Sequence, residues 1–526
     1  MPRERQPEYK PLSFSTTMRN PKRIADFIKC LLPFEGHILD NEIINSVAVS
    51  LIKNRLYRPL KAMSANKKWR DLFDGEEPID EKTAMAIMEA SPQNHKEAGF
   101  DKGWPSRFDT WYKLPMEFGF IYYEIGRQIE ISGTGHMLID SVSGDSQDDR
   151  KIKQVFLNAL MKYQTNNPFR KNANENAPLP LLLNVIRLLK QEDKDSKGIY
   201  RKEIPLIICS RSNNADKIFR KIKEIRKKYS FSYGEEIIYE VCLQMLGAGP
   251  EQKKRFKIEQ ITGEAIDDFI RKMRITGIVS LRGNGRFLDF NTFEQGNIEY
   301  ILKKYTFYQK FLSKKEYFEY MGRIDPVILS LEPVPDNNAD YLKQKTLINW
   351  AEENSFEDIA REIHIACVRS GESKNAVLRF IDKPVRLEFL VSVILKAKFP
   401  GMHIRPNYTV DDEGLPVFTA AGGMADIECF DSDNNPLVEV TLMCSRTQAT
   451  NEMPAITRHL SEAIRKYPDK YVFSVFIAPV IHPDTVYMAG YSKYQYKTDI
   501  FPFSADDFVK KIENATKLAD AVSGKH

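Results

Sequence analysis

Two short segments decide the fold of the C-terminal region: residues 424–430, Met-Ala-Asp-Ile-Glu-Cys-Phe, and residues 437–442, Leu-Val-Glu-Val-Thr-Leu. Both are apolar, and the turn between them is made of Asp, Ser, Asn and Pro, so we predict two neighbouring strands joined as a hairpin. Strand alternation places Glu439 on the face opposite its two valine neighbours. The hairpin therefore brings Asp426 and Glu439 side by side.

An acidic side chain within an apolar strand is costly to bury unless a positive group meets it. A divalent cation such as Mg²⁺ would do so, since it prefers carboxylate, carbonyl and water oxygens. The ordinary alternative is that Glu439 faces solvent on a half-exposed strand and that Asp426 merely begins a strand. The pair alone does not decide between the two interpretations.

Further elements are predicted around this hairpin. Helical spacing over residues 386–399 ends at Pro400-Gly401, a strand region follows, and a helix and a strongly apolar strand come after the hairpin. The order α–β–β–β–α–β is typical of a small α/β sheet domain. The predicted segments are helix 386–399, strands 403–410, 424–430 and 437–443, helix 447–466 and strand 471–478.

Three more residues with reactive side chains lie in the predicted helices. Glu388 belongs to the first helix, and Glu452 and His459 lie two turns apart on nearly the same face of the second. Each has an ordinary reading: Glu388 as a surface residue, Glu452 as an acid favoured at a helix N-terminus, and His459 as a surface or hydrogen-bonded core histidine. Together they give the order helical acid, strand acid, strand acid, helical acid, histidine, which metal-dependent nucleases of the PD-(D/E)XK type use.

Upstream, two segments combine a helix with a hairpin, as at the end of a winged-helix module. The first hairpin is predicted over residues 118–123 and 128–131, and the second over residues 278–281 and 286–290. Arg282-Gly283-Asn284-Gly285 separates the strands of the second, and its glycines and asparagine suit the positive φ angles of a tight turn. We expect helices over residues 20–32 and 266–275 to accompany the two hairpins.

Basic residues gather in two upstream segments, the predicted helix 215–228 and residues 253–257. Such runs are usually solvated faces, but next to wing-like hairpins they suit contacts to DNA phosphates. Residues 298–321 and 341–369 read as charged helices around a polar stretch at 326–338, which together predict a helical linker.

Composition sets the broad class of the protein. The chain has 526 residues, 77 Lys plus Arg against 72 Asp plus Glu, and a net charge of +5, so it is not a polyelectrolyte-like binder. Its six cysteines form no CxxC pair, which argues against a disulfide framework or structural zinc and suits a reducing cytoplasm. No secretory signal or membrane-spanning run is predicted.

The C-terminal motifs resemble the catalytic domain of AlwI-like Type IIS restriction and nicking endonucleases. The matching segments occur in the family's order and spacing. A looser resemblance extends upstream, where residues 274–277 and 282–284 resemble the family's second wing and residues 20–36 its opening helix. The catalytic-domain segments are residues 416–422, 424–428, 438–441, 454–459 and 476–479.

The resemblance implies roles for individual residues. Asp426 and Glu439 would hold Mg²⁺ (or Mn²⁺ in its place), with the carbonyl of Val440 as a third ligand. Glu388 and Glu452 would be accessory acids, and His459 would lie near the attacking water or the scissile phosphate. The lysine that this type of nuclease carries two residues after the second acid is Thr441 here. Either the metal-bound water needs no lysine, or Glu452 and His459 replace it.

The expected architecture is a multi-domain α+β and α/β protein with winged-helix-like DNA-binding modules at residues 1–150 and 151–297. A helical linker (298–373) and a PD-(D/E)XK nuclease-type sheet domain (374–526) would follow. The resemblance implies a bacterial, cytoplasmic Type IIS endonuclease that cuts double-stranded DNA outside a short asymmetric sequence.

Its implied partners are a second nuclease subunit or a transient dimer on DNA and a cognate DNA methyltransferase. A strand-specific nickase is the nearest alternative. A DNA-binding regulator with a non-catalytic nuclease-like domain and a nuclease that recognises DNA structure are the others.

Overall fold

The computed structural model folds into two compact units, with residues 8–333 in unit 1 and residues 339–523 in unit 2. The ranges that the structure describes are 8–14, 21–74, 78–97, 99–143, 148–170, 172–249, 256–333, 339–420 and 423–523. Parts of several predicted features lie outside them: Asn20, residues 144–147, the basic residues 253–255, residues 334–338, Ala421 and Gly422.

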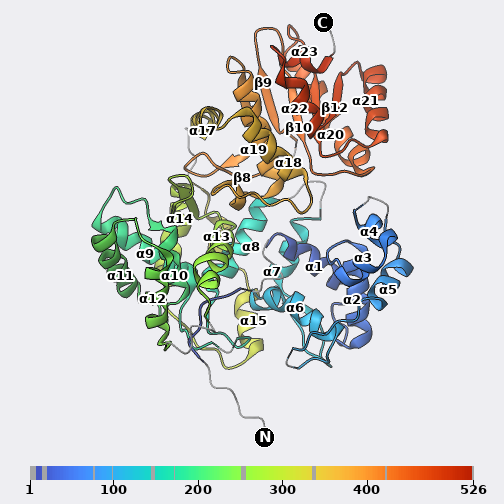
Figure 1. Ribbon diagram of the computed structural model, residues 1–526. Helices are drawn as coiled ribbons and strands as arrows, with labels where there is room; N and C mark the ends of the chain where they lie inside the picture. Colours follow the sequence, from blue (N-terminus) through green and yellow to red (C-terminus); the bar gives the residue numbers. More distant parts are fainter. Residues whose placement is uncertain are drawn as a thin grey trace. The chain divides into compact units, whose positions relative to one another are not determined.

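Unit 1 is mainly helical (Figure 1). Its elements are α1 (Arg23–Leu31), η2 (Leu32–Phe34), α2 (Asn41–Lys53), α3 (Leu60–Ala65), α4 (Lys67–Asp74), α5 (Glu81–Glu89), α6 (Trp104–Glu117), β1 (Ile121–Tyr122), β2 (Glu130–Ile131), α7 (Gly133–Asp140), α8 (Asp149–Lys162), α9 (Pro178–Glu192), β3 (Ile199–Tyr200), η3 (Arg201–Glu203), α10 (Ile204–Ile208), α11 (Ala215–Tyr229), α12 (Glu235–Leu246), η5 (Gln260–Glu264), α13 (Ala265–Arg274), β4 (Val279–Arg282), β5 (Phe287–Phe290), η6 (Thr292–Glu294), α14 (Gln295–Lys304), α15 (Lys314–Gly322) and α16 (Pro326–Ser330).

Unit 2 mixes helices and strands. Its elements are α17 (Ala339–Glu353), α18 (Phe356–Cys367), η7 (Leu378–Phe380), α19 (Lys383–Lys398), β6 (His403–Pro406), β7 (Thr409–Val410), β8 (Pro416–Phe418), β9 (Ile427–Phe430), β10 (Leu437–Val440), η8 (Gln448–Glu452), α20 (Met453–Lys466), β11 (Ser474–Ala478), α21 (Pro483–Tyr496), β12 (Ile500–Ser504), α22 (Ala505–Glu513) and α23 (Leu518–Ser523).

The main sheet of unit 2 has the strand order β12-β11-β10-β9-β6 within the described residues. Strand β10 pairs antiparallel with β9 and parallel with β11, so the sheet is mixed. The predicted β9–β10 hairpin is confirmed, with Val438 opposite Ile427. One register step further along, Glu439 lies opposite Asp426, at the edge of the paired segment.

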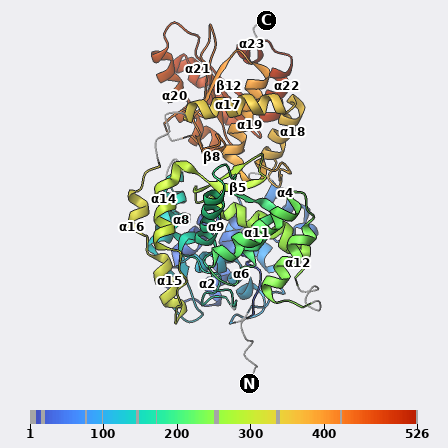
Figure 2. The same cartoon turned by 90° about the vertical axis from the view of Figure 1, so that its left-hand side faces the viewer.

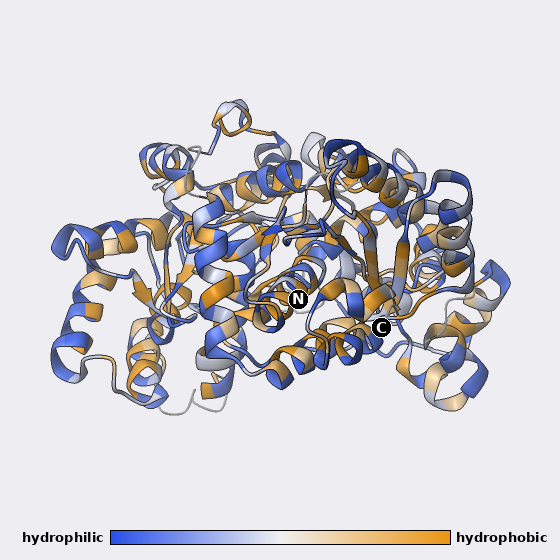
Figure 3. Cartoon of the chain, turned by 90° about the horizontal axis from the view of Figure 1, so that it is seen from above, coloured by the Kyte–Doolittle hydropathy of each residue, from blue (hydrophilic) through white to orange (hydrophobic). Residues whose placement is uncertain are grey.

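Helices α20 and α21 pack on one face of this sheet. Met453, Ile456 and Leu460 of α20 follow helical spacing and are buried in one cluster with Leu437 of β10 and Phe476 of β11. Figure 3 shows the same division between hydrophobic and hydrophilic sides on many helices of the chain. Because Glu439 shares a face with Leu437, it points toward α20.

Helices α17 and α18 both pack against α19 (Figures 1 and 2). Residues 339–367, the second half of the predicted linker 298–373, therefore belong to unit 2, while α14, α15 and α16 belong to unit 1. The division falls between residues 333 and 339 rather than near residue 374. The charged surfaces of α17 and α18 made their packing faces hard to see in the sequence.

In unit 1, strands β3, β5 and β4 form a small antiparallel sheet in that order. The β4–β5 hairpin is the predicted one, and Asn284 in its turn has a φ of 54°, as expected for this position. The predicted pairing of the first hairpin is also present, as β1 with β2. Helices α2 to α5 enclose a separate core that includes Ile52, Phe73 and Ile87.

Several predicted helices are interrupted. Residues 298–321 contain the end of α14 and most of α15, and residues 341–369 contain α17 and α18. Ser313 and Ser355 cap the second helix of each pair by accepting a hydrogen bond from a backbone N–H, which starts a new helix there. Pro326 begins the short helix α16 instead of a loop, with Asp325 as its cap.

The strand region predicted at 403–410 is divided between β6 and β7, which belong to different sheets. Strand β12 and helix α21, which complete the main sheet and one of its faces, were not predicted. No helix in the described ranges is both long enough and apolar enough to cross a membrane.

Candidate active site

Asp426 and Glu439 are joined by backbone hydrogen bonds at the edge of the β9–β10 pair. The N–H of Asp426 donates to Oε2 of Glu439 at 3.3 Å, and the N–H of Val440 donates to Oδ2 of Asp426 at 2.7 Å. Glu439 is buried, with 7% of its surface exposed. The solvent-facing alternative for Glu439 therefore does not hold, and the two carboxylates converge as predicted.

Asn407, in the loop after β6, fixes the backbone that carries Asp426. Its N–H donates to the carbonyl of Asp426 at 2.8 Å, and its side-chain amide donates to the carbonyl of Ala425 at 2.7 Å. These two bonds hold the chain at the point where β9 begins. Asn407 thus sets the position of Asp426 through the backbone.

His459, on α20, contacts the same carboxylate group. Its Nδ1 lies 3.0 Å from Oε1 of Glu439, and both side chains are about nine-tenths buried. Because a carboxylate accepts, this pairing favours the tautomer in which Nδ1 carries the proton. Nε2 is buried and has no hydrogen-bond partner among the residues that the structure describes, so its lone pair is not used within that part of the protein.

Glu452 lies at the end of the π-helical turn η8, directly before α20. The hydroxyl of Thr441 donates to Oε1 of Glu452 at 3.2 Å. Burial, together with the neighbouring charge of Glu439, raises the pKa of Glu452 despite the hydrogen bond from Thr441. Thr441, which stands where a lysine was expected, is therefore hydrogen-bonded to Glu452, one of the two residues expected to replace that lysine.

Glu388, on α19, is 3% exposed. Burial, and then the charges of Glu388 and Glu439, raise the pKa of Asp426 well above its usual range. Glu388 is thus close enough to act on Asp426 electrostatically, and its interpretation as a surface residue is wrong. All five sequence-predicted side chains gather in one place.

The charges at this place suit a bound cation. Several carboxylates lie together in a buried environment, and a divalent ion between them would offset their mutual repulsion. No group of three or more His, Cys, Asp or Glu side chains in the described ranges is arranged to hold a metal ion. The set expected from the sequence needs only the two carboxylates of Asp426 and Glu439 and the carbonyl of Val440, with water completing the shell as Mg²⁺ prefers.

Gln448 organises the loop that leads from β10 to α20. This fully buried residue donates to the carbonyls of Met443 and Val480 at 2.6 and 2.7 Å. Its Oε1 accepts from the N–H of His482 and from the hydroxyl of Thr485. Gln448 thereby ties the loop after Glu439 to the start of α21. Nothing in the sequence distinguished it, or Asn407, from an ordinary polar loop residue.

Two arginines, Arg446 before α20 and Arg458 within it, lie near these residues in the sequence. Arg446 pairs with Asp484 of α21, at 2.8 Å. Arg458 is exposed on α20, next to His459 in sequence. Of these two arginines, Arg458 is the one without a carboxylate partner among the described residues, so its charge is available to a DNA phosphate.

Comparison with known families decides the identity of the chain. The model of the AlwI restriction endonuclease family matches residues 116–355 and 327–510, which together span well over half of the sequence. The chain belongs to the AlwI restriction endonuclease family. Membership confirms the resemblance drawn from the motifs and supports a nuclease that acts as a restriction enzyme. No curated protein sequence matches the chain.

Solved structures of two restriction endonucleases are similar to parts or most of the chain. The small subunit of the heterodimeric restriction endonuclease R.BspD6I is 21% identical over 30% of this chain and 76% of its own, with a TM-score of 0.25. The restriction endonuclease FokI is 12% identical over 92% of this chain and 96% of its own, with a TM-score of 0.23. At these TM-scores we draw no conclusion from either structure.

Proposed function

We propose that this member of the AlwI family is a Type IIS restriction endonuclease. It would recognise a short asymmetric sequence in double-stranded DNA and hydrolyse phosphodiester bonds outside that sequence in a Mg²⁺-dependent reaction. The observation that carries the proposal is the convergence of Asp426, Glu439 and His459, whose contacts form one connected group. Glu388 and Glu452 add accessory negative charge beside it.

Asp426, Glu439 and the Val440 carbonyl are the proposed ligands of the ion. When bound, Mg²⁺ would supply an activated water and neutralise negative charge that develops on the phosphate. Glu439 orients the imidazole of His459 through Nδ1, so that Nε2 is available to accept a proton from the attacking water. Thr441, at the sequence position of the absent lysine, holds Glu452 through a hydrogen bond.

DNA recognition is proposed to reside in winged-helix-like modules at residues 1–150 and 151–297. Catalysis is proposed for a PD-(D/E)XK domain at residues 374–526, the part of unit 2 that follows α18. Two observations support the second module: the β4–β5 hairpin belongs to the small sheet β3-β5-β4, and Arg286 at its turn is exposed. The catalytic assignment takes support from the mixed sheet and its acids. The separation into two compact units suits recognition and cutting at different places.

Two alternatives remain part of the proposal. A strand-specific nickase would use the same residues, with one active site per chain cutting one strand. A DNA-binding regulator with an inactive nuclease-like domain would have no need of an intact, connected acid and histidine group. We also propose a cytoplasmic, bacterial setting, with a second nuclease subunit on DNA and a cognate methyltransferase as partners.

Substitution of Glu439 tests the proposal directly. Glu439→Ala and Asp426→Ala should each abolish cleavage while leaving DNA affinity within a few-fold, because catalysis and recognition are assigned to different units. EDTA should stop cleavage and Mg²⁺ or Mn²⁺ should restore it, whereas Ca²⁺ should support binding without turnover. Cleavage assays and gel shifts on the same DNA measure both properties.

A matched control is Glu462→Ala, which removes an exposed acid from α20 in the same unit and should leave cleavage unchanged. Retained cleavage in Glu439→Ala would refute the assigned site. Loss of DNA binding in that variant, with a normal melting temperature, would contradict the separation of the two activities.

A further inference from the structure

Residues 58–70 of unit 1 form a short segment of unusual charge. The segment covers α3, the one-residue junction at Asn66 and the first half of α4, and it contains five basic residues and no acidic one. The basic residues are Arg58, Lys61, Lys67, Lys68 and Arg70. None of them belongs to a motif of the AlwI family described above, and the proposed catalytic residues all lie in unit 2.

The segment is firmly held by the helices behind it. Ala62 and Met63 of α3 and Phe73 of α4 are buried in the core that α2 and α5 complete, and Trp69 packs against the same core. The N–H of Ala62 also donates to the hydroxyl of Ser91, after α5. Ala62, Met63 and Trp69 thus anchor the backbone, while Leu60 is 75% exposed beside the basic side chains.

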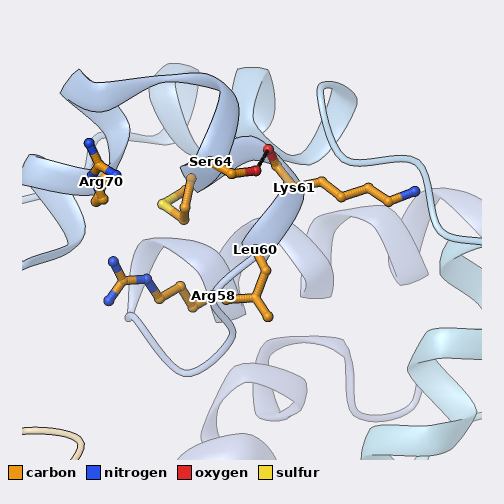
Figure 4. Close-up of a pocket in the computed structure, with 6 residues that line it drawn as sticks. Arg58, Leu60, Lys61, Ser64 and Arg70 are labelled. Carbon is orange, nitrogen blue, oxygen red and sulfur yellow. Dashed lines mark hydrogen bonds between the residues drawn. The ribbon is translucent and has the colours of Figure 1, made fainter.

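A surface pocket of about 530 Å³ lies on this segment. It is lined by Arg58, Leu60, Lys61, Met63, Ser64 and Arg70 (Figure 4). In the figure the guanidinium groups of Arg58 and Arg70 lie on the same side, while the Lys61 side chain extends the other way. The lining charges are all positive, so an anion is the complementary occupant.

Most of this positive charge is not neutralised within the protein. The side chains of Lys61, Lys67, Lys68 and Arg70 make no hydrogen bond or ion pair in the portion of the chain that the structure describes. In the basic helix α11, by comparison, two of the cations are paired, Lys223 with Glu192 and Arg226 with Glu203. The segment 58–70 therefore keeps its charge available to a partner.

The position of these cations is also unfavourable for the helix itself. Lys67, Lys68 and Arg70 lie at the N-terminal end of α4, whose first turn contains no acid. The positive end of the helix dipole repels cations there, and acids are the residues that stabilise such an end. An anionic partner bound at this place would offset both the repulsion between the cations and the helix dipole and the repulsion among the cations themselves.

We propose that residues 58–70 bind the phosphate backbone of duplex DNA, with Lys61 and Arg70 each contacting a phosphate. This inference rests on the proposed function, since it assigns the DNA a contact surface on unit 1. Contacts of this kind fix the position of a duplex but carry no sequence information. The surface is therefore assigned to positioning the DNA, and base reading belongs to other residues.

The test is the salt dependence of binding to a mixed-sequence duplex in Ca²⁺. Each phosphate contact contributes about 0.9 to the slope of log Kd against log salt concentration. The full-length variant Lys61→Gln/Arg70→Gln should therefore lose about 1.8 of the wild-type slope. As a result, its affinity deficit should shrink by about tenfold between 50 and 200 mM salt. Fluorescence anisotropy across a salt titration measures these values.

Two further variants show whether a change in slope comes from the charge at this surface, from the loss of charge anywhere on unit 1, or from a folding defect. Lys82→Gln/Lys102→Gln removes the same charge from exposed positions of unit 1 outside the segment and should keep the wild-type slope. Lys61→Arg/Arg70→Lys should also keep it, because the charges remain. None of the three variants should melt below the wild-type temperature, since the substituted side chains are exposed.

Equal slopes for the wild type and Lys61→Gln/Arg70→Gln, with DNA binding otherwise intact, would overturn this inference and leave the proposed function standing. Failure of the wild type to bind duplex DNA would overturn both. If the segment were instead a site for free phosphate, inorganic phosphate at constant ionic strength would compete with DNA for the wild type. The wild type and Lys61→Gln/Arg70→Gln would then have the same slope of log Kd against log salt concentration, which would also refute the backbone contact.

Discussion

At the scale of single residues, the candidate site depends on side chains that do no chemistry as much as on those proposed to do it. Glu439 contacts the backbone of Asp426 with one oxygen and His459 with the other. Asn407 and Gln448 fix the two loops that enter and leave this group. The reactive group is therefore positioned by hydrogen bonds from both ends of the β9–β10 hairpin.

The role proposed for Nε2 of His459 can be separated from the contact that His459 makes with Glu439. An asparagine amide can replace Nδ1 but has nothing at the place of Nε2, whereas the longer glutamine can reach that place. His459→Asn should lower the cleavage rate by about 10²- to 10⁴-fold, the usual contribution of a general base. Single-turnover cleavage at saturating enzyme measures this rate.

The melting temperature of His459→Asn should stay near that of the wild type, because the contact with Glu439 is kept. A cleavage rate within a few-fold of the wild type would show that Nε2 takes no part in proton transfer. His459→Gln serves as the matched comparison, since it keeps a polar group near Nε2 but cannot act as a base.

The reactive residues were predictable from the sequence, while their supporting residues were not. Asp426 and Glu439 stood out because acids are rare in apolar strands, and His459 and Glu452 because of their helical spacing from each other. Asn407 and Gln448 act through backbone groups of residues that become neighbours only after folding. Polar loop residues have no periodic pattern that would distinguish such contacts beforehand.

At the scale of elements, turn and cap chemistry decided which predictions succeeded. Hairpins with glycine and asparagine in the turn, such as β4–β5, were predictable because few other sequences allow that backbone. The predicted helices are too long where Ser313 and Ser355 cap a new helix within a continuously charged sequence. Strand β12 was missed because it becomes recognisable as a strand mainly through its pairing with β11.

Helix α8 offers a pH test of packing in unit 1. Lys162 at its end is buried and donates to the carbonyls of Tyr320, at 3.1 Å, and Arg323, near the end of α15. Burial lowers the pKa of Lys162 to about 8. The folded protein therefore holds fewer protons than the unfolded chain between pH 8 and about 10.4, and its stability should rise with pH there.

The expected rise is roughly 1 kcal/mol per pH unit in the free energy of unfolding. Urea denaturation at several pH values between 8 and 9.5 measures it, below the range in which exposed tyrosines ionise. Lys162→Met should show a flatter profile than the wild type across this window. Parallel profiles for the two proteins would mean that Lys162 is not the group responsible.

At the scale of the whole molecule, the chain contains one proposed catalytic group, and one such group handles one strand at a time. Recognition and cutting are assigned to separate compact units. If each chain cuts a single strand per encounter, complete cleavage of a duplex requires two events or two chains. The number of chains or of successive events needed for one double-strand break therefore follows from the single Asp426/Glu439 pair in each chain.

A supercoiled plasmid with one recognition site should accordingly pass through an open-circle form before linear product appears. Raising the enzyme concentration should shorten that interval, because a second nuclease unit is recruited from solution. Persistent open circles at every concentration would identify a natural nickase. Immediate linear product, independent of concentration, would show that one chain cuts both strands and would contradict the single-site argument.

The most direct test of the central claim is to map every DNA end produced from a mixed-sequence plasmid by the wild type and by Glu439→Ala in Mg²⁺. We predict that wild-type ends fall at a fixed distance to one side of a common, short, asymmetric sequence, and that Glu439→Ala produces none. Ends scattered without a common sequence, or the same ends from Glu439→Ala, would contradict the assignment of this chain as a Type IIS endonuclease acting through Asp426 and Glu439.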